Sequence, residues 1–377
     1  MKKVLYITNI AGAKFSINFV GSALATAKSL GMDFYVVANR SASNPEQIAA
    51  DEKKYGVHLL HADISRSPIS ISNIKAYKQI CEIIRKYDID YIHCNTPVGG
   101  VLGRLAGRRC GVKKIIYQVH GFHFYKGAPK INWIVYYPIE RLLAHFSDAI
   151  ITINTEDYKQ AKKFHLRKKG QIYYVPGVGI DITEYTKIEK QRQEKRDELG
   201  IPNDDLVIIS VGELNKNKNN SVIISALGII NNPHIHYILC GVGDEKEQMQ
   251  TLTHELGLDD TIHFLGYRTD VKELYAASDI FVMPSFREGL SRSIMEAMAS
   301  GLPCIVSKIR GNVDLIQNGK GGFLCEPNDV SAFANAIKLC TDSRRMQFKM
   351  HNLFAIKKFD IHVVENQLYK IYKDVFV

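Results

Sequence analysis

Short apolar runs alternate with longer amphipathic segments along most of this chain. Apolar runs of strand length lie near residues 3–9, 33–38, 57–61, 90–95, 114–120 and 148–154. Such alternation is typical of parallel strands covered by helices on both faces. The pattern breaks near residues 173–181, with Pro176, Gly177 and Gly179, and a charged run follows at 187–198. It then restarts, so the sequence predicts two doubly wound α/β domains.

The restarted pattern supplies the second set of expected strands, near residues 206–211, 236–240, 262–265, 279–283, 303–307 and 322–324. A chain of 377 residues is too long for one ordinary core, which supports the division. We expect an N-terminal domain at 1–178, a C-terminal domain at 179–359 and a last helix at 360–377. No apolar run approaches the roughly 18–20 residues that a membrane span needs.

The seven cysteines are scattered, and no two have the C-x-x-C spacing. This usage favours a reducing cytosol and predicts neither a disulfide framework nor a zinc site.

Positive charge is concentrated in the first half. Residues 1–180 carry 26 Lys and Arg against 12 Asp and Glu, whereas residues 181–377 carry 23 against 27. Solvated helix faces explain part of this excess. With the apolar and aromatic segment 131–137 nearby, it also suits an anionic membrane surface or a lipid-diphosphate acceptor. No recognition motif supports nucleic-acid binding.

The stretch from Glu288 to Gly301 has the strongest functional signal. It follows the apolar run 279–283 and opens a helix that Ser291 can cap, with one carboxylate, Glu288, before the helix and another, Glu296, inside it. Backbone N–H groups in a first helical turn lack intrahelical partners and favour an anion. Amides for phosphate and carboxylates for hydroxyls together suit a nucleotide sugar.

Other loops of the second half add weaker signals. Gly212 and Lys218 lie in the loop after the strand at 206–211. This loop could hold a phosphate through charge and backbone amides, although a solvated polar turn has the same composition. Gly241 could line the same site and Arg268 could border a nucleotide base. Turn chemistry explains both equally well.

The first half offers fewer specific residues. Gly12 and Lys14 follow the first strand, and a single glycine there is not the G-x-G-x-x-G of a dinucleotide site. This loop is either a plain turn or part of an acceptor site. His120 ends a strand and precedes a glycine, which suits contact with a substrate hydroxyl. His120 and His123 are spaced like a metal pair, but no nearby carboxylate or cysteine completes a ligand set.

Together these residues resemble the glycosyltransferase family 4 enzymes of the GT-B fold, especially bacterial capsule and exopolysaccharide transferases. The most specific part of the resemblance is the E-x7-E signature, here Glu288 to Glu296. The match spans nearly the whole chain, and its supporting parts are the loop ending at Lys218, the pair His120-Gly121, the segment 176–181 and the segment 319–324.

The resemblance implies two Rossmann-like domains facing a central cleft, and retaining transfer from a nucleotide-activated sugar without a metal or other cofactor. Glu288 would contact the hydroxyls of the donor sugar and Glu296 the ribose. His120 would lie near the reacting side of the sugar, and the helix at 360–377 would return to the first domain.

The same resemblance assigns the diphosphate to Lys218 and to the backbone amides of Gly289, Leu290 and Ser291. Preorganised donors help most where negative charge develops on the leaving group. Many family members carry arginine where this chain has Glu213, so one phosphate contact is missing. We expect the Glu213 carboxylate to turn away or to pair with a lysine.

The sequence therefore predicts a cytoplasmic enzyme, peripheral at the inner face of the cell membrane, that extends a lipid-linked glycan in capsule or exopolysaccharide synthesis. The donor would be a UDP-hexose or UDP-N-acetylhexosamine, with uridine assigned by resemblance alone. The alternatives are a transferase with a soluble acceptor and a nucleotide-sugar epimerase of the same fold. A paired-carboxylate hydrolase would have no use for phosphate-holding groups. A binding module without catalysis would explain the charge but not the polar loops at the strand ends.

Overall fold

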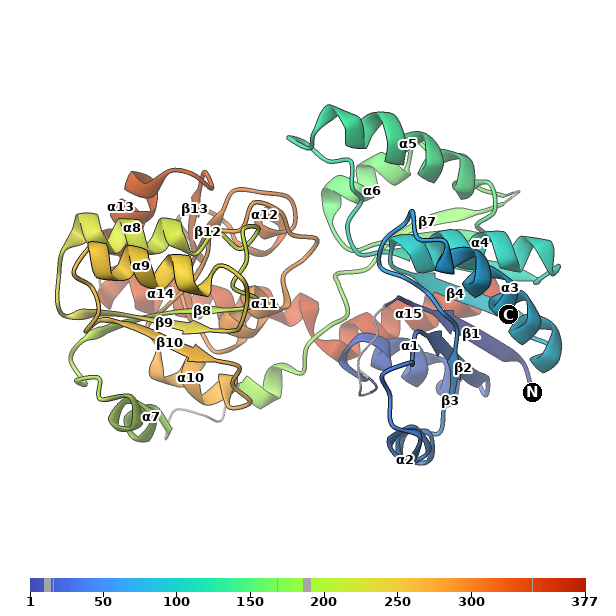
Figure 1. The fold of residues 1–377 in the computed structure, drawn as a ribbon, viewed down its shortest axis with the longest axis horizontal. Helices are drawn as coiled ribbons and strands as arrows, with labels where there is room; N and C mark the ends of the chain where they lie inside the picture. The colour runs from blue at the N-terminus through green and yellow to red at the C-terminus, as the bar shows by residue number, and fades with distance from the viewer. Residues whose placement is uncertain (10–14, 16, 168, 186–190, 341) are drawn as a thin grey trace. The chain divides into compact units, whose positions relative to one another are not determined.

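The computed structural model of the protein describes residues 1–9, 15, 17–167, 169–185, 191–340 and 342–377 (Figure 1). These residues form two compact units, the first made of Met1–Gly179 and Ile361–Val377 and the second of Ile180–Asp360. Gly12 and Lys14 lie outside the described residues.

The first unit is built on a seven-stranded parallel sheet with the order β3-β2-β1-β4-β5-β6-β7. Its elements are β1 (Lys3–Ile7), α1 (Ile17–Ser29), β2 (Asp33–Ala38), α2 (Pro45–Tyr55), β3 (His58–His61), α3 (Ser72–Tyr87), β4 (Tyr91–Asn95), α4 (Pro97–Arg109), β5 (Lys114–Val119), α5 (Lys130–Ala144), β6 (Ala149–Thr152), α6 (Thr155–Ala161), β7 (Gln171–Tyr174) and α15 (Ile361–Phe376).

Side chains of each strand alternate between two apolar layers. In β1, Val4 and Tyr6 pack on the layer with α1 and α15, and Leu5 and Ile7 pack on the layer with α3 and α4. Because side chains along a strand point to opposite faces, a strand buried on both sides is apolar at nearly every position. This explains the continuous apolar runs in the sequence.

The second unit has a six-stranded parallel sheet with the order β10-β9-β8-β11-β12-β13. Its elements are η1 (Ile182–Tyr185), α7 (Arg192–Leu199), β8 (Leu206–Val211), α8 (Ser221–Ile230), β9 (Ile235–Cys240), α9 (Lys246–Glu255), β10 (Ile262–Gly266), α10 (Val271–Ala277), β11 (Ile280–Met283), α11 (Arg292–Ala299), β12 (Cys304–Ser307), α12 (Asn312–Leu315), β13 (Gly322–Cys325), α13 (Val330–Leu339), α14 (Asp342–Ala355) and η3 (Ile356–Phe359).

Helices cover this second sheet on both faces as well. The α8, α9 and α13 helices lie over one face, and α10 and α11 lie over the other (Figure 1). Two doubly wound, Rossmann-like units are thus the architecture of the chain, as the alternating pattern predicts.

The charged run at 187–198 leads into a helix, because Arg192–Leu199 forms α7. Arg196 is fully buried and donates to the backbone oxygen of Ala277 and to Asp279. Lys195 bonds Asp270 at 2.8 Å. These charges are paired within the second unit, so a run that looks solvated in the sequence is a docked helix.

The last helix, α15, belongs to the first unit. Its Tyr372 hydroxyl lies 2.7 Å from Nδ1 of His93 in β4, and Phe376 stacks on Tyr91 with 4.5 Å between ring centroids. Gly179 has φ +77°, and a Cβ there would lie 2.7 Å from Cα of Ile361. A glycine is therefore required where the start of α15 passes the end of the first long segment.

None of the helices in the described part of the chain is long and apolar enough to cross a membrane. The seven cysteines are all free thiols.

Candidate active site

The second unit places two polar loops at the switch point of its sheet. Strand β8 lies between β9 and β11, so the chain leaves β8 and β11 toward opposite sides. Ligands of such sheets bind at this point, beyond the carboxyl ends of the strands. The loops after β8 and β11 bring Lys218 and Glu288 together, with 2.7 Å between Nζ and Oε1. Their side chains are 22% and 14% exposed, so the pair is partly desolvated but reachable.

Two asparagines hold Lys218 in this position. Asn217 donates to the backbone oxygen of Arg287 and accepts from the backbone N–H of Phe286. Asn219 donates to the backbone oxygen of Pro284, at 3.2 Å, on the other side of Lys218. The β8 and β11 loops are therefore joined on both sides of the lysine, which fixes its side chain against Glu288.

The backbone from Glu288 leads directly into α11. Ser291 caps this helix, because its hydroxyl accepts from the N–H of Ile294 at 3.4 Å, and Leu290 packs on the apolar layer below. Gly289 lies between Glu288 and this cap. The loop after β12 adds Arg310, a buried arginine whose Nε donates to the backbone oxygen of Glu288 at 3.3 Å.

Gly212 and Gly241 allow the loops after β8 and β9 to approach each other closely. A Cβ on Gly241 would lie 1.8 Å from the backbone oxygen of Gly212, and one on Gly212 would lie 3.3 Å from Cε of Lys218. Any side chain at Gly241 would push the β8 loop, and with it the lysine, out of position.

Glu296 lies inside α11 and is held at both oxygens. Oε1 accepts from Nε of Arg292 at 2.8 Å, and Oε2 accepts from the hydroxyl of Tyr275 at 3.3 Å. The carboxylate is 15% exposed. Its orientation is thus set by neighbours on α11 and α10.

Arg268 is engaged elsewhere. Its guanidinium bonds Asp270 and Glu198, and these carboxylates raise the pKa of the arginine. Among the described residues, its guanidinium partners are Asp270 and Glu198 rather than Lys218 or Glu288, so the structure does not group Arg268 with that pair. We expected the Glu213 carboxylate to turn away or to pair with a lysine; the side chain is exposed and accepts from the amide of Asn215 at 2.9 Å.

In the first unit, His120 also lies at the carboxyl edge of its sheet. Its Nε2 lies 2.8 Å from Oδ1 of Asn95, the fully buried last residue of β4, and its ring lies against Phe19. An amide oxygen only accepts, so the neutral ring carries its proton on Nε2 and leaves Nδ1 as an acceptor. Burial lowers the pKa of His120 to about 4, so the ring is neutral at physiological pH.

Thr96, next to Asn95, adds a strained backbone to this edge. It has φ +63°, a conformation that β-branched residues rarely adopt, and it begins α4. Its hydroxyl accepts from the N–H of Asn9 at 3.2 Å, which ties the β1 and β4 loops together. Strain of this kind is concentrated at functional sites.

His123 lies apart from His120 in its contacts. Its ring stacks on Tyr136 of α5 with 4.6 Å between centroids, and its backbone oxygen accepts from Asn132. Within the described residues, no cluster of three or more His, Cys, Asp or Glu side chains could hold a metal ion.

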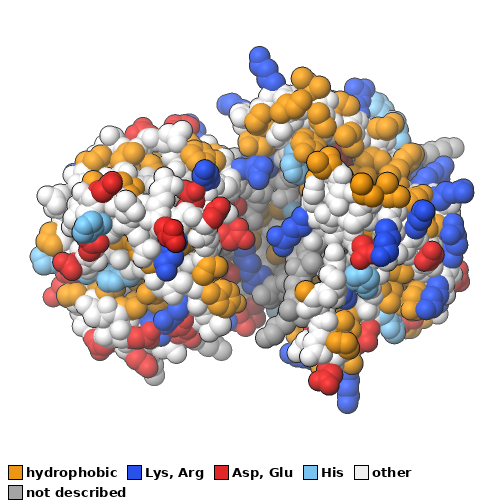
Figure 2. Space-filling view, viewed as in Figure 1, with side chains coloured by type: hydrophobic (Ala, Val, Ile, Leu, Met, Phe, Trp, Pro, Cys, Tyr) orange, Lys and Arg blue, Asp and Glu red, His pale blue; other side chains and the backbone are white. Residues whose placement is uncertain are grey.

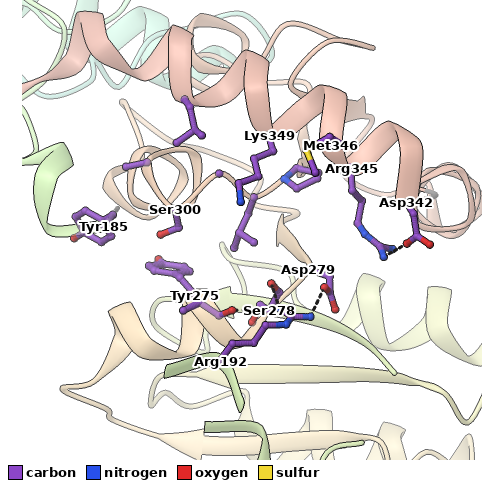
Figure 3. A pocket seen from close by; sticks show the side chains of 16 residues that line it. Tyr185, Arg192, Tyr275, Ser278, Asp279, Ser300, Asp342, Arg345, Met346 and Lys349 are labelled. Carbon is purple, nitrogen blue, oxygen red and sulfur yellow. Dashed lines mark hydrogen bonds and ion pairs between the residues drawn. The ribbon is translucent and has the colours of Figure 1, made fainter. Parts of the chain in front are cut away.

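The second unit also contains a cavity of about 530 Å³ away from these loops (Figure 3). It is lined by residues that precede β11 and β12, at the amino edge of the sheet, and by residues of α14. Arg192 bonds Asp279 and Arg345 bonds Asp342 across its wall. Since these charges neutralise one another, we do not assign the nucleotide to this cavity.

Sequence reasoning missed Asn217, Asn219, Arg310 and Asn95. The two asparagines flank Lys218 in a run of Lys and Asn, and this alternation was the available signal. Arg310 and Asn95 follow or end a strand at the carboxyl edge, but their types are common in ordinary turns. Only the tertiary contacts distinguish them.

Comparison with known proteins defines the class of the chain. Residues 191–352 match the family described as Glycosyl transferases group 1, and residues 3–154 match the family described as Glycosyl transferase 4-like. The chain is 36% identical over 316 residues to the glycosyltransferase EpsD of Bacillus subtilis, covering 82% of this chain and 80% of that protein.

Two further proteins are similar. The UDP-Gal:alpha-D-GlcNAc-diphosphoundecaprenol alpha-1,3-galactosyltransferase of Escherichia coli is 32% identical over 290 residues, covering 75% of this chain and 74% of that protein. The solved structure of Anabaena HepE in complex with UDP and glucose has a TM-score of 0.81 at 20% identity, and each chain is covered completely.

The fold and these matches define a glycosyltransferase with two Rossmann-like domains, the GT-B architecture. The chain belongs to the group 1, family 4-like glycosyltransferases.

Proposed function

We propose that the protein is a retaining glycosyltransferase that moves a sugar from a UDP-sugar to a lipid-linked glycan. The observation that carries the proposal is the pair Lys218–Glu288, held at the switch point of the second sheet and directly before α11. The pair combines a cation for a diphosphate with a carboxylate for sugar hydroxyls.

The donor diphosphate is assigned to Lys218 and to the backbone amides of Gly289, Leu290 and Ser291. Negative charge grows on the leaving diphosphate during transfer, and fixed donors stabilise it without reorganising. Arg310 supports this assignment, because its Nε donates to the Glu288 backbone oxygen and its guanidinium adds positive charge beside this loop.

Glu288 is assigned to the hydroxyls of the transferred sugar and Glu296 to the ribose. An ionised carboxylate accepts two or more hydrogen bonds, and both carboxylates are already oriented by neighbours. Gly212 and Gly241 are assigned to the wall of this site, where the absence of side chains leaves room for the nucleotide. Arg268 is assigned to the border of the nucleotide base, where Asp270 and Glu198 already bind its guanidinium.

In the first unit, His120 is the proposed contact to the reacting side of the sugar. Its neutral ring would accept a hydrogen bond from a sugar hydroxyl at Nδ1, while Asn95 fixes the other nitrogen. His123, with the undescribed Gly12 and Lys14, is assigned to the acceptor side.

The names of two relatives support a lipid-linked acceptor. The Escherichia coli relative acts on GlcNAc-diphosphoundecaprenol, and a 22% identical protein of Campylobacter jejuni is named for a diphospho-undecaprenol acceptor as well. We accordingly place the enzyme at the inner face of the cell membrane, in the assembly of a capsule or exopolysaccharide. A 25% identical relative from Bacillus anthracis is named as an N-acetyl-alpha-D-glucosaminyl L-malate synthase, so a soluble acceptor is the second candidate.

A thermal-shift screen tests the donor assignment. A ligand that binds only the native protein adds about 2.7 kcal/mol to the free energy of unfolding at one hundred times its Kd. We expect UDP, UDP-hexoses and UDP-N-acetylhexosamines to raise Tm, with GDP, ADP and their sugars as controls. If a guanosine or adenosine compound alone raises Tm, the uridine assignment is wrong; if none does, the donor site itself is wrong.

A further inference from the structure

Helix α5 of the first unit turns an apolar stripe toward solvent. Ile131, Ile134, Val135, Ile139 and Leu142 are each 40–68% exposed. At about 100° per residue, these five side chains and exposed Pro138 fall within one arc of roughly 140°. Figure 2 shows hydrophobic side chains gathered over this helix. Single exposed hydrophobic residues are ordinary, but a continuous stripe marks an interaction surface.

The opposite face of α5 already supplies the contacts that fold the helix onto the first unit. Trp133 and Tyr137 pack on Phe124, and Tyr137 also packs on Phe164. The outward stripe is therefore not needed to pack α5 onto the first unit.

A buried ion pair also fixes the orientation of α5. Glu140 of α5 accepts from Arg104 of α4 at 2.8 Å and from the Tyr117 hydroxyl at 3.1 Å. The Arg104 guanidinium lies 3.9 Å from the centre of the Tyr117 ring. Because the helix cannot roll without breaking these contacts, its apolar stripe is a fixed feature of the surface.

Positive charge lies along one edge of the stripe and on the neighbouring segment. Lys130 and Arg141 lie along one edge of the arc, and exposed Lys126 precedes the helix. The α6 segment, which packs against α5 through Phe164, adds exposed Lys159, Lys162 and Lys163. The acidic residues nearby are engaged: Glu140 binds Arg104, and Asp148 binds Arg167 at 3.0 Å. The outward surface of α5 is therefore apolar at its centre and cationic along one edge, with further exposed lysines on the neighbouring α6 segment.

We propose that α5 docks on an anionic lipid bilayer and lies parallel to its surface. Its apolar stripe would enter the boundary between headgroups and acyl chains; the stripe consists of Ile131, Ile134, Val135, Ile139 and Leu142. An apolar stripe with Lys and Arg along its edge is the pattern of an interfacial helix. With 15 residues, α5 is about 22 Å long and too short to span a bilayer. A second copy of the chain fits this surface less well, because pairing two stripes would bring the cationic margins together.

The docking rests in part on the proposed function, since a lipid-linked acceptor has to be reached at a membrane. The two claims remain separable, because vesicle binding and sugar transfer to a short-chain, detergent-free acceptor are measured independently. If the wild-type protein transfers sugar to this acceptor but does not bind anionic vesicles, the docking alone is refuted.

Co-sedimentation of the full-length protein with vesicles tests the proposal. We expect binding to vesicles of phosphatidylcholine with phosphatidylglycerol, and weaker binding to phosphatidylcholine alone. The double substitution I134Q/I139Q keeps helix propensity and should lower the partition coefficient tenfold or more, because two apolar side chains leave the acyl boundary. The matched control I69Q/I71Q changes two isoleucines of the same unit that are 90% and 82% exposed, and should alter it less than twofold.

Failure of the wild-type protein to bind anionic vesicles would overturn the proposal, as would an equal loss in both double variants. A dimer that I134Q/I139Q dissociates, with vesicle binding unchanged, would assign the stripe to a second copy instead.

A second measurement places a probe on the stripe. Trp133 is the only tryptophan of the chain, so W133F/I134W moves the sole indole to the outward face of α5. Its emission should shift to the blue on anionic vesicles and be quenched by brominated lipid. An indole placed in the second unit by W133F/I229W should show neither change, and an unresponsive I134W probe on bound protein would contradict the docking.

Discussion

Replacing Lys218 by methionine should weaken UDP binding, whereas replacing Glu288 by glutamine should not. In the free protein, Glu288 accepts from Lys218 at 2.7 Å, so the carboxylate and a bound diphosphate compete for the same ammonium group. UDP has a diphosphate but no sugar. The two substitutions therefore separate the group that binds phosphate from the group that binds the sugar.

The magnitudes follow from the burial of the pair. A hydrogen bond to a charged group contributes about 1.5–3 kcal/mol, so K218M should raise the Kd of UDP roughly 10- to 150-fold. The pair keeps 22% and 14% exposure, so solvent reduces its own free energy to about 1 kcal/mol or less. E288Q should therefore leave the Kd of UDP unchanged or lower it up to about fivefold, while transfer of the sugar is lost.

Isothermal titration calorimetry with UDP measures both effects. K216M is the matched control, because Lys216 is an exposed lysine of the same loop, and its Kd should stay within twofold. If E288Q weakens UDP binding as much as K218M does, Glu288 contacts the nucleotide and the assignment of the two residues is wrong.

Three further predictions concern stability. Burial lowers the pKa of His93 to about 3 and of His120 to about 4, so the native protein binds fewer protons than the unfolded chain below pH 6.5. As the pH is lowered below 6.5, the free energy of unfolding should therefore fall by roughly 1.4 kcal/mol per pH unit for each ring. His93→Gln should flatten this slope in urea titrations between pH 7 and 5. Arg104→Met leaves Glu140 buried without its partner and should lower the free energy of unfolding by about 3–5 kcal/mol. Adding Glu140→Gln to this variant should recover part of that stability. An equal loss in the single and the double variant would contradict the ion-pair reasoning. Gly241→Ala should cost about 1–3 kcal/mol in thermal unfolding and abolish UDP binding; a variant with normal Tm would show that the β8 loop has room for a side chain.

The sequence predicts the order of strands and helices well because both sheets are buried on two faces. Apolar runs mark buried strands, and glycines mark the ends where loops approach closely. The α7 helix escapes this reasoning, since its Arg196 is buried through hydrogen bonds that only the tertiary structure reveals. Strand β7 was also missed, because its residues adjoin the Pro-Gly segment that signals a break.

The functional residues divide in the same way. The loop positions of Lys218 and Glu288 follow from the pattern, but their 2.7 Å contact depends on strands far apart in the sequence. Arg268 and Arg310 look alike in the sequence. In the structure, Arg268 bonds two carboxylates and Arg310 bonds the Glu288 backbone oxygen. No local sequence pattern distinguishes these two outcomes.

Sugar transfer by purified protein tests the central claim most directly. The protein is incubated with a UDP-sugar selected by the thermal-shift screen and with a diphospho-polyprenyl-linked sugar, and products are followed by mass spectrometry. The account predicts a lipid-linked glycan heavier by one sugar, UDP in equal amount and an α linkage by NMR. Glu288→Ala should form neither product while its circular dichroism stays unchanged. Full turnover by Glu288→Ala, or UDP release without a lengthened glycan, would contradict the claim.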